Sequence, residues 1–300
     1  MMVHALRHSD TSMFDTSERV SALSSIENRM LELVSCADDL HSDIKTAVHY
    51  HLNGEGRRIR AQLAIDSSFA LDLDSDDTIA IGATVELLHN ASLVHDDLQD
   101  RDEMRRGAPS VWAKFGEPIA ICVGDLLISA AYAASASLKR TTNSANFIQT
   151  VHSSVSRTIY GQSADLYAQV HKPKELNIYE QIAAAKSGPL LSMPMELPLI
   201  VAGHNDKIEA CRRALNYYAI AYQIADDIND IDLDQRFEDD QVRLNAVLIF
   251  GEGTVTKDAI SRSTERLNQL LQLALKEAEE LPSSCHDTLT RYCHFLTKRQ

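Results

Sequence analysis

The N-terminal part of the sequence places its apolar residues at helical spacing. From Val20 to Val48 an apolar side chain recurs every three or four positions, which predicts one long amphipathic helix or two abutting helices. The stretch Asn53-Gly54-Glu55-Gly56 then supplies residues that are common at helix ends, and the basic run Arg57-Arg58-Ile59-Arg60 follows directly. The pattern therefore predicts a helix end immediately before a cluster of positive charge.

Most of the remaining chain repeats the helical pattern. Helices are predicted over residues 78–100, 119–138, 146–170, 179–186, 208–230 and 267–281. No segment alternates apolar and polar residues long enough to predict a sheet, and 11 glycines with 7 prolines are few for 300 residues. No Gly/Ser-rich or Pro-rich linker divides the chain. We therefore expect an all-α fold with a single helical domain over residues 18–300, preceded by a disordered segment over residues 1–17.

The acidic composition limits the classes of partner. A total of 29 Lys and Arg against 43 Asp and Glu gives a formal net charge of −14, which argues against a general nucleic-acid or anionic-membrane surface. The five cysteines form no Cys-x-x-Cys pair, and no run of about 18 apolar residues suggests a membrane span. The first residues lack the apolar core of a signal peptide. These features predict a cytoplasmic protein with reduced thiols, no nucleic-acid partner and no membrane span.

One acidic motif occurs twice, as Asp96-Asp97-Leu98-Gln99-Asp100 and as Asp226-Asp227-Ile228-Asn229-Asp230. Residues four apart on a helix point in directions about 40° apart, so the first and last aspartates of each motif share a face. Carboxylates crowded on one face repel one another and favour a bound cation. Hard oxygen ligands with room for water suit Mg²⁺, which typically binds one or two carboxylates together with substrate phosphates.

The alternative for such a motif is a solvated acidic surface, which is the usual explanation of a charge run. Two observations favour the metal site instead. The motif is repeated, and Arg105-Arg106-Gly107 follows the first copy closely enough for guanidinium groups to reach the same diphosphate.

Together these residues resemble the trans-isoprenyl diphosphate synthase family, the polyprenyl synthetases, over about residues 56–251. The two aspartate-rich motifs of that family are similar to residues 96–107 and 222–230. Further family elements are matched by Gly56-Arg57-Arg58-Ile59-Arg60, with Arg57 in place of a lysine, by Lys186-Ser187 in place of Lys-Thr, by Gly124-Asp125 and by Gly161-Gln162.

The resemblance implies a bundle of long, mostly antiparallel helices around a central cavity, usually assembled as a homodimer. It implies a prenyltransferase that condenses isopentenyl diphosphate with an allylic prenyl diphosphate. The implied cofactor is Mg²⁺, with three ions when substrate is bound. The two acidic motifs should then face one another across the cavity and share metal ions that bridge one diphosphate, because negative charge grows on that group as it leaves.

The resemblance also assigns residues to roles. The implied metal ligands are Asp96, Asp97, Asp100, Asp226, Asp227 and Asp230. The implied catalytic residues are Asp96, Asp97, Asp100, Lys186, Asp226 and Asp227. The implied substrate-binding residues are Arg57, Arg60, His89, Arg105, Arg106, Lys186, Ser187 and Gln223. No side chain is assigned as a general base, since the released diphosphate can take the proton, and Arg58 is expected to be structural.

Product length should depend on the side chains below the first acidic motif. Ser92 lies one helical turn below Asp96, and Leu88 lies two turns below it, about 12 Å away. In the family, bulky aromatic residues at these positions stop elongation early, whereas Ala91 and Ser92 are small. We therefore expect a product of C20 or longer.

The chain departs from the family pattern at two places. The Gly-Lys that usually follows the second motif is missing from residues 231–236, and Arg243 stands where a later lysine is usual. Pro189, Pro194 and Pro198 are expected to interrupt the helix after Lys186 by kinking it, because proline removes a helical hydrogen bond.

Three alternatives compete with the synthase. A terpene cyclase shares the fold and the first motif, but the second site is Asp-Asp-x-x-Asp and an isopentenyl pocket is present. A non-catalytic partner subunit is expected to have lost an acidic motif, whereas both are kept here. A purely structural acidic bundle explains neither Arg105-Arg106 nor the basic run at 57–60.

Overall fold

The computed structural model describes residues 16–35, 42–54, 56–171, 173–229 and 244–298, and these are almost entirely helical. The helices are α1 (Thr16–Val34), α2 (Ser42–Leu52), α3 (Ile59–Ala70), α4 (Ser75–Gln99), α5 (Val111–Phe115), α6 (Glu117–Ser135), α7 (Ser144–His171), α8 (Leu176–Ala202), α9 (Ile208–Asn229), α11 (Ala246–Phe250), α12 (Lys257–Ala278) and α13 (Ser283–Thr297). A short hairpin is formed by β1 (Met104–Arg105) and β2 (Ala108–Pro109).

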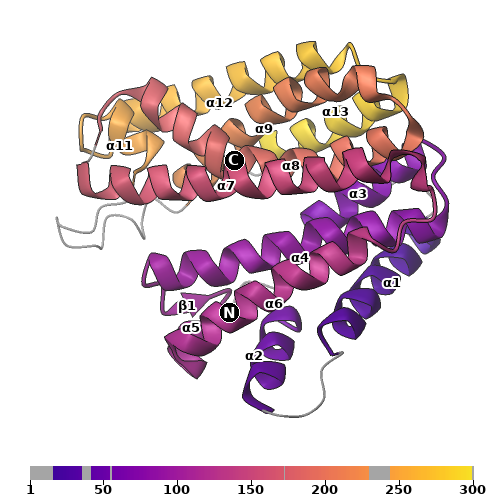
Figure 1. The fold of residues 1–300 in the computed structure, drawn as a ribbon. Coiled ribbons are helices and arrows are strands. Elements are labelled where there is room, and N and C mark those ends of the chain that lie inside the picture. The colour runs from indigo at the N-terminus through magenta and orange to yellow at the C-terminus, as the bar shows by residue number, and fades with distance from the viewer. Residues whose placement is uncertain (1–15, 36–41, 55, 172, 230–243, 299–300) are drawn as a thin grey trace.

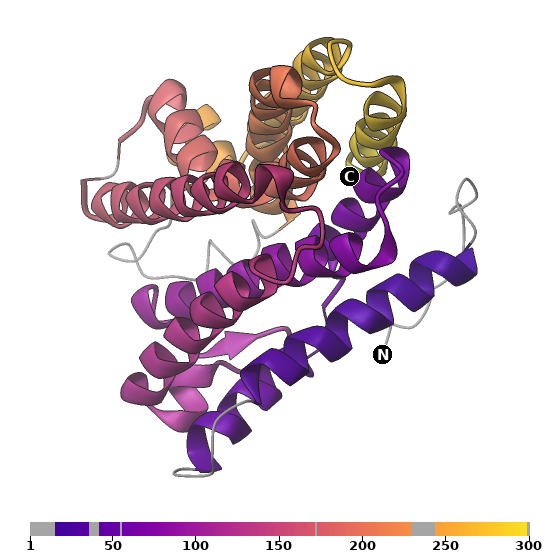
Figure 2. The ribbon, with the colours of Figure 1, turned by 45° about the vertical axis from the view of Figure 1, so that its right-hand side comes forward.

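The long helices form two groups that meet along α3, α4 and α8. Figure 1 shows α1, α2, α4, α5 and α6 on one side and α7, α8, α9, α12 and α13 on the other. The same grouping is visible in Figure 2 after a turn of 45°. Helix α3 packs against both α4 and α8, and α4 also contacts α8 directly. The predicted all-α, single-domain bundle is therefore present.

Most predicted helices exist close to their predicted bounds. The N-terminal pattern forms two helices, α1 and α2, which was one of the two alternatives. Helix α1 begins at Thr16, whereas residues 1–15 of the predicted disordered segment lie outside the described residues. The sequence pattern missed α3, α5, α11, α13 and the hairpin.

Helix α4 is the central element that carries the first acidic motif. Its N-terminus is capped by Asp74, whose side chain accepts a hydrogen bond of 2.9 Å from the Asp77 amide. Most of its residues are buried, since α1, α3, α6 and α8 all pack against it. Burial on nearly all sides holds the helix rigidly and delivers Asp96, Asp97 and Asp100 at its C-terminal end.

The hairpin after α4 positions the two arginines. Its two central residues, Arg106 and Gly107, have φ values of 54° and 79°, as a type I′ turn between antiparallel strands requires. Arg106 is a non-glycine residue in the left-handed region, which is uncommon and costs conformational energy. The turn therefore sets Arg105 on a strand and Arg106 at the tip.

Helix α8 does not end after Lys186, so Pro189, Pro194 and Pro198 do not break it, and the expected kink stays a prediction. The helix continues to Ala202 with all three prolines inside it. Residues 188–201 of α8 are buried, so tertiary packing offsets the hydrogen bonds that proline removes. The Ser192 hydroxyl also donates to the Pro189 carbonyl over 3.1 Å.

Helix α6 (Glu117–Ser135) is the one helix among the described residues that is long and apolar enough to cross a membrane. This result rests on length and composition, and 44% of its apolar window is buried inside the protein. Helix α6 packs extensively against α4. The four described cysteines, Cys122, Cys211, Cys285 and Cys293, are free thiols.

Helices α7 and α8 approach each other closely at Gly161. A Cβ atom at this position would lie 2.3 Å from the Ala185 carbonyl carbon and 2.3 Å from the Lys186 nitrogen. Such distances are far below van der Waals contact, so only glycine permits this helix spacing. The contact places Lys186 of α8 within reach of α7.

We expect Gly161→Ala to lower the free energy of unfolding by about 2 kcal/mol, because the added methyl group must push two backbones apart. Chemical denaturation followed by circular dichroism measures this change. Ser163→Ala, at an exposed position of the same helix, is the control and should leave stability nearly unchanged. Equal stability of Gly161→Ala and the wild type would contradict the prediction.

Candidate active site

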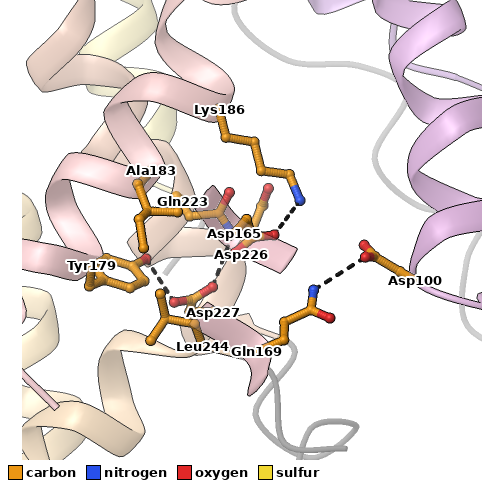
Figure 3. A pocket seen from close by; sticks show the side chains of 11 residues that line it. Asp100, Asp165, Gln169, Tyr179, Ala183, Lys186, Gln223, Asp226, Asp227 and Leu244 are labelled. Atoms are coloured by element: carbon orange, nitrogen blue, oxygen red, sulfur yellow. Dashed lines mark hydrogen bonds and ion pairs between the residues drawn. The ribbon is translucent and has the colours of Figure 1, made fainter. Parts of the chain in front are cut away.

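A pocket of about 140 Å³ opens between the C-terminal end of α4 and helices α7, α8 and α9. Figure 3 shows Asp100 on one side and the other labelled residues on the opposite side. The lining residues are Asp100, Asp165, Gln169, Tyr179, Ile182, Ala183, Lys186, Gln223, Asp226, Asp227 and Leu244. The two acidic motifs, which are about 130 residues apart in the sequence, thus contribute carboxylates to the same pocket.

The wall formed by α7 and α8 places a cation among these carboxylates. Lys186 Nζ lies 2.7 Å from Asp165 Oδ2, and Asp96 and Asp100 raise the pKa of Lys186 against the opposing effect of burial. The Gln169 amide donates to Asp100 Oδ1 over 3.2 Å and so links α7 to the first acidic motif (Figure 3). Lys186 therefore remains charged next to the acidic groups.

The surroundings of Asp96 disfavour the charged form of its carboxylate. Burial raises its pKa to about 6, and Asp100 adds to the shift while Lys186 opposes it. A carboxylate that lacks both water and a full complement of positive charge gains free energy when a cation binds beside it. Asp96 therefore has the electrostatic character of a metal ligand.

Asp97 is enclosed by the protein instead. Its side chain is 1% exposed, and Arg105 Nε donates to its Oδ1 over 2.8 Å while Arg105 Nη2 contacts the same oxygen. Burial raises the pKa of Asp97, and the hydrogen bonds from Arg105 oppose that shift. The predicted metal and catalytic role of Asp97, and the predicted substrate contact of Arg105, stay predictions, since the structure pairs the two side chains with each other.

Asp227 is enclosed in a similar way. Tyr179 donates its hydroxyl proton to Asp227 Oδ2 over 2.7 Å, and the Ala246 amide donates to the same oxygen over 2.8 Å. Gln223 Nε2 donates to Oδ1 over 3.1 Å. The neighbouring Asp226 lines the pocket, and Asp230 lies outside the described residues.

A second, positively charged cluster lies at the start of α3 and at His89, two turns before Asp96 on α4. Arg60 Nη1 donates to His89 Nε2 over 2.9 Å, which leaves the His89 proton on Nδ1. Burial, followed by the neighbouring arginines, lowers the pKa of His89 far below its usual value. His89 Nδ1 and Arg60 Nε are buried donors that have no partner among the described residues. Such donors suit an anion that is absent from the protein itself.

Arg106 joins this cluster from the tip of the hairpin. Its guanidinium group lies against Gly56, where a Cβ atom would be 2.6 Å from Nη1. Burial lowers the pKa of Arg106, and Arg58, Arg105 and Arg60 contribute by repulsion. Arg57 is exposed at the same loop. The residues predicted to bind isopentenyl diphosphate thus come from four places. Arg57 lies in the loop before α3, Arg60 on α3, His89 on α4 and Arg106 in the hairpin turn.

Glu86 of α4 contacts the start of α3 and Arg58 in the loop before it. Its carboxylate, 1% exposed, accepts a hydrogen bond of 3.1 Å from the Ala61 amide at the start of α3 and lies 3.6 Å from Arg58 Nη1. Arg58 also donates to the Leu52 carbonyl over 2.5 Å. Arg58 is thus buried in structural contacts, as predicted, and its charge is balanced inside the protein.

The structure places the remaining predicted residues less directly. Gln223 lines the pocket and bonds Asp227, whereas Ser187 is half-buried on α8 and does not line the pocket. Residues 231–236 and Arg243, where the family pattern is broken, lie outside the described residues. The two predicted sites for diphosphates are therefore formed mainly by residues that the sequence already indicated.

The sequence interpretation missed Asp165, Gln169, Tyr179 and His51. Asp165 and Gln169 follow Gly161-Gln162 at helical spacing, which was the available signal for a polar wall on α7. Tyr179 carried no signal, because its partner Asp227 is about 50 residues away in the sequence. His51 is a buried histidine beside the basic cluster, and burial with Arg106 nearby lowers its pKa to about 4.

Comparison with known proteins identifies the family to which the chain belongs. The family profile described as Polyprenyl synthetase matches residues 41–240. A short chain isoprenyl diphosphate synthase of Methanocaldococcus jannaschii is 30% identical over 218 residues, covering 71% of this chain and 64% of that protein. This chain belongs to the polyprenyl synthetase family.

A second relative is named for a different prenyl diphosphate product. A probable farnesyl diphosphate synthase of Bradyrhizobium diazoefficiens is 33% identical over 219 residues, covering 70% of this chain and 66% of that protein. The chain thus spans just under two thirds of the length of these two relatives.

Solved structures share the fold. The geranylgeranyl pyrophosphate synthetase of Geoglobus acetivorans superposes with a TM-score of 0.80 at 23% identity, covering 93% of this chain and 99% of that chain. A decaprenyl diphosphate synthase of Rhodobacter capsulatus gives a TM-score of 0.75 at 16% identity, covering 94% of this chain and 97% of that chain. At these identities the likeness shows the fold alone, and it confirms the predicted isoprenoid-synthase type of bundle.

Magnesium, which the family implies, can be tested against the residues present. Within the described part of the chain no three His, Cys, Asp or Glu side chains gather closely enough to hold a metal ion by themselves. Mg²⁺ commonly takes only one or two protein carboxylates and completes its shell with water and substrate phosphate. Asp100 and Asp226 line one pocket, and the raised pKa of Asp96 marks an unmet need for positive charge, so these three residues fit such an ion.

We expect Asp96→Asn to stabilise the protein at neutral and alkaline pH. The pKa of Asp96 is 3.8 when unfolded and about 6 when folded, so the buried charge destabilises the fold as pH rises from 3.8 to 6 and fully above 6. The variant should gain about 2 kcal/mol of unfolding free energy at pH 8 without metal, and almost none at pH 4.

Thermal and chemical unfolding at both pH values measures this difference. Asp206→Asn, at an exposed position, is the control and should show no comparable gain. A melting temperature of Asp96→Asn below that of the wild type at pH 8 would show that the carboxylate stabilises the fold.

Proposed function

We propose that this protein is a Mg²⁺-dependent trans-prenyltransferase that condenses isopentenyl diphosphate with an allylic prenyl diphosphate. One observation carries the proposal. A pocket shared by both acidic motifs lies near a separate buried cluster of arginine and histidine donors, and both are reached from α4. The reaction needs two such places, since one diphosphate must leave and the other must stay intact.

The acidic pocket is assigned to the allylic diphosphate. Asp96, Asp100 and Asp226 would hold Mg²⁺, which supplies positive charge to the leaving diphosphate when it is bound. Lys186 donates from the opposite wall, where Asp165 keeps its ammonium group in place. These side chains orient the substrate so that its hydrocarbon chain points away from the charges.

The basic cluster is assigned to isopentenyl diphosphate. Arg60 and His89 present buried donors that lack acceptors among the described residues, and Arg106 lies beside Gly56 in the same cluster. Arginine donors bind phosphate oxygens in a bidentate manner without a metal ion. A metal-free pocket leaves the isopentenyl diphosphate unactivated, as the chemistry requires. No side chain is assigned as a base, because the departing diphosphate can accept the proton.

The terpene cyclase alternative receives no support from the geometry. A cyclase ionises one prenyl diphosphate and has no use for a second diphosphate pocket. The unpartnered donors of Arg60 and His89 therefore favour the two-substrate reaction.

Assembly and location stay proposals. The family resemblance implies a homodimer, and α6 and α7 expose large apolar side chains, among them Ile121, Ile159 and Tyr160. Exposed apolar residues of this size are common at subunit interfaces. We therefore propose a homodimer and, from the composition, a cytoplasmic location.

Asp226→Asn should lower turnover about 100-fold or more, because one charge that holds the metal against the leaving diphosphate is lost. Incorporation of labelled isopentenyl diphosphate in the presence of Mg²⁺ measures turnover. Circular dichroism should show an unchanged fold. Asp258→Asn, at an exposed position of α12, is the matched control and should keep wild-type activity. Undiminished turnover by Asp226→Asn would remove the second acidic motif from the mechanism.

Product length is predicted to be C20 or longer. Leu88 and Ala91 are buried on α4 and Ser92 is half-buried one turn below Asp96, so no aromatic side chain of α4 closes this stretch. Incubation with farnesyl and isopentenyl diphosphates, followed by mass spectrometry, should show products longer than C15. Ser92→Phe should shorten the product, whereas Ser92→Ala should not. Release of nothing longer than C15 by the wild type would refute the prediction.

A further inference from the structure

The two adjacent aspartates of the second acidic motif both line the pocket but differ in how their carboxylates are held. Asp227 is 6% exposed, and its two carboxylate oxygens accept hydrogen bonds from Tyr179 and Gln223. Neighbouring residues on a helix point about 100° apart. Fixing Asp227 in the protein interior therefore fixes the direction in which Asp226 faces the pocket.

Tyr179 is the side chain best placed to hold Asp227. Its ring is 2% exposed on α8, and its hydroxyl donates to Asp227 Oδ2 over 2.7 Å, as the dashed line in Figure 3 marks. Burial raises the pKa of Tyr179 well above its usual value, so the hydroxyl keeps its proton and stays a donor. The bond joins α8, which carries Lys186, to α9, which carries Asp226.

The same carboxylate oxygen also holds the segment that follows. The Ala246 amide donates to Asp227 Oδ2 over 2.8 Å, and Asn245 Nδ2 donates to the Asp227 carbonyl over 3.3 Å. Asn245 in turn caps α11 by accepting from the Val247 amide over 2.8 Å. One carboxylate thus ties α8, α9 and the start of α11 together beneath the pocket.

We propose that Tyr179 is a positioning residue for the metal-binding face of the second acidic motif, and that Asp227 transmits its effect instead of binding metal. This inference rests on the proposed function for the identity of the bound ion. Removing the tyrosine hydroxyl leaves Oδ2 of Asp227 with one donor fewer. The Asp227 side chain can then turn further into the pocket and displace that of Asp226. Among the described residues, no hydrogen bond or ion pair joins Tyr179 to Arg60, His89 or Arg106, so the basic cluster should be unaffected.

The test compares Tyr179→Phe with Tyr292→Phe. Tyr292 is a partly buried tyrosine whose hydroxyl also donates to an aspartate, Asp66, over 3.3 Å, but that pair lies outside the pocket. Both variants lose the same atom. Tyr179→Phe should raise the Mg²⁺ concentration for half-maximal turnover about ten-fold while leaving KM for isopentenyl diphosphate unchanged. Tyr292→Phe should change neither value.

Hydrogen exchange of the metal-free protein supplies a readout that needs no catalysis. Amides of residues 245–250 should exchange faster in Tyr179→Phe than in the wild type or in Tyr292→Phe. Ala246→Pro is a second variant, because it removes the other donor to Asp227 Oδ2 at the first helical position, where proline is tolerated. It should raise the Mg²⁺ requirement in the same direction.

Two results would overturn the proposal. One is an unchanged Mg²⁺ requirement and unchanged exchange in Tyr179→Phe, and the other is an equal change in Tyr292→Phe, which would show a merely structural effect. A wild-type protein without turnover on any primer would refute the proposed function instead. In that case faster exchange at residues 245–250 in Tyr179→Phe alone would still support the positioning role, and unchanged exchange would reject it.

Discussion

The repulsion between carboxylates gathered at one end of the bundle is the constraint on which the rest of the site depends. Asp96, Asp97, Asp100, Asp165, Asp226 and Asp227 all lie in or beside one pocket. Folding removes water from them, which is costly for each charge unless a donor or cation replaces the water. Asp97 and Asp227 receive hydrogen bonds from the protein, whereas Asp100 and Asp226 line the pocket. A bound cation would therefore supply part of the positive charge that these carboxylates need.

The basic cluster gathers buried donors and positive charge, and it is balanced only in part by the protein. Arg58 forms ion pairs with Glu27 and Glu86, whereas Arg60 forms none among the described residues, and Arg60 Nε and His89 Nδ1 are donors that no described residue accepts. His89 and Asp96 lie two turns apart on α4, about 10 Å. One rigid helix therefore carries a residue of each incomplete charge cluster. Its burial by α1, α3, α6 and α8 keeps the spacing between the two constant.

The sequence allowed the long helices, the acidic motifs and the basic loop to be predicted, because each leaves a local pattern. It did not reveal the continuation of α8 through three prolines, since buried packing by distant residues outweighs the local cost. Asp165 and Tyr179 were missed for a related reason. Their importance comes from contacts with Lys186 and Asp227, which only the helix packing at Gly161 and beneath the pocket brings within reach.

The two motifs solve one geometric problem in the same way. Adjacent aspartates on a helix point about 100° apart, and the second of each pair accepts hydrogen bonds from partners inside the protein. Asp97 finds Arg105, and Asp227 finds Tyr179, Gln223 and the Ala246 amide. Asp97, at the hairpin end of α4, has a charged partner, and Asp227, among α8, α9 and α11, has neutral donors. In both motifs the enclosed aspartate, Asp97 or Asp227, limits the directions in which its neighbour, Asp96 or Asp226, can point. A pair of carboxylates therefore orients a metal ligand better than a single aspartate would.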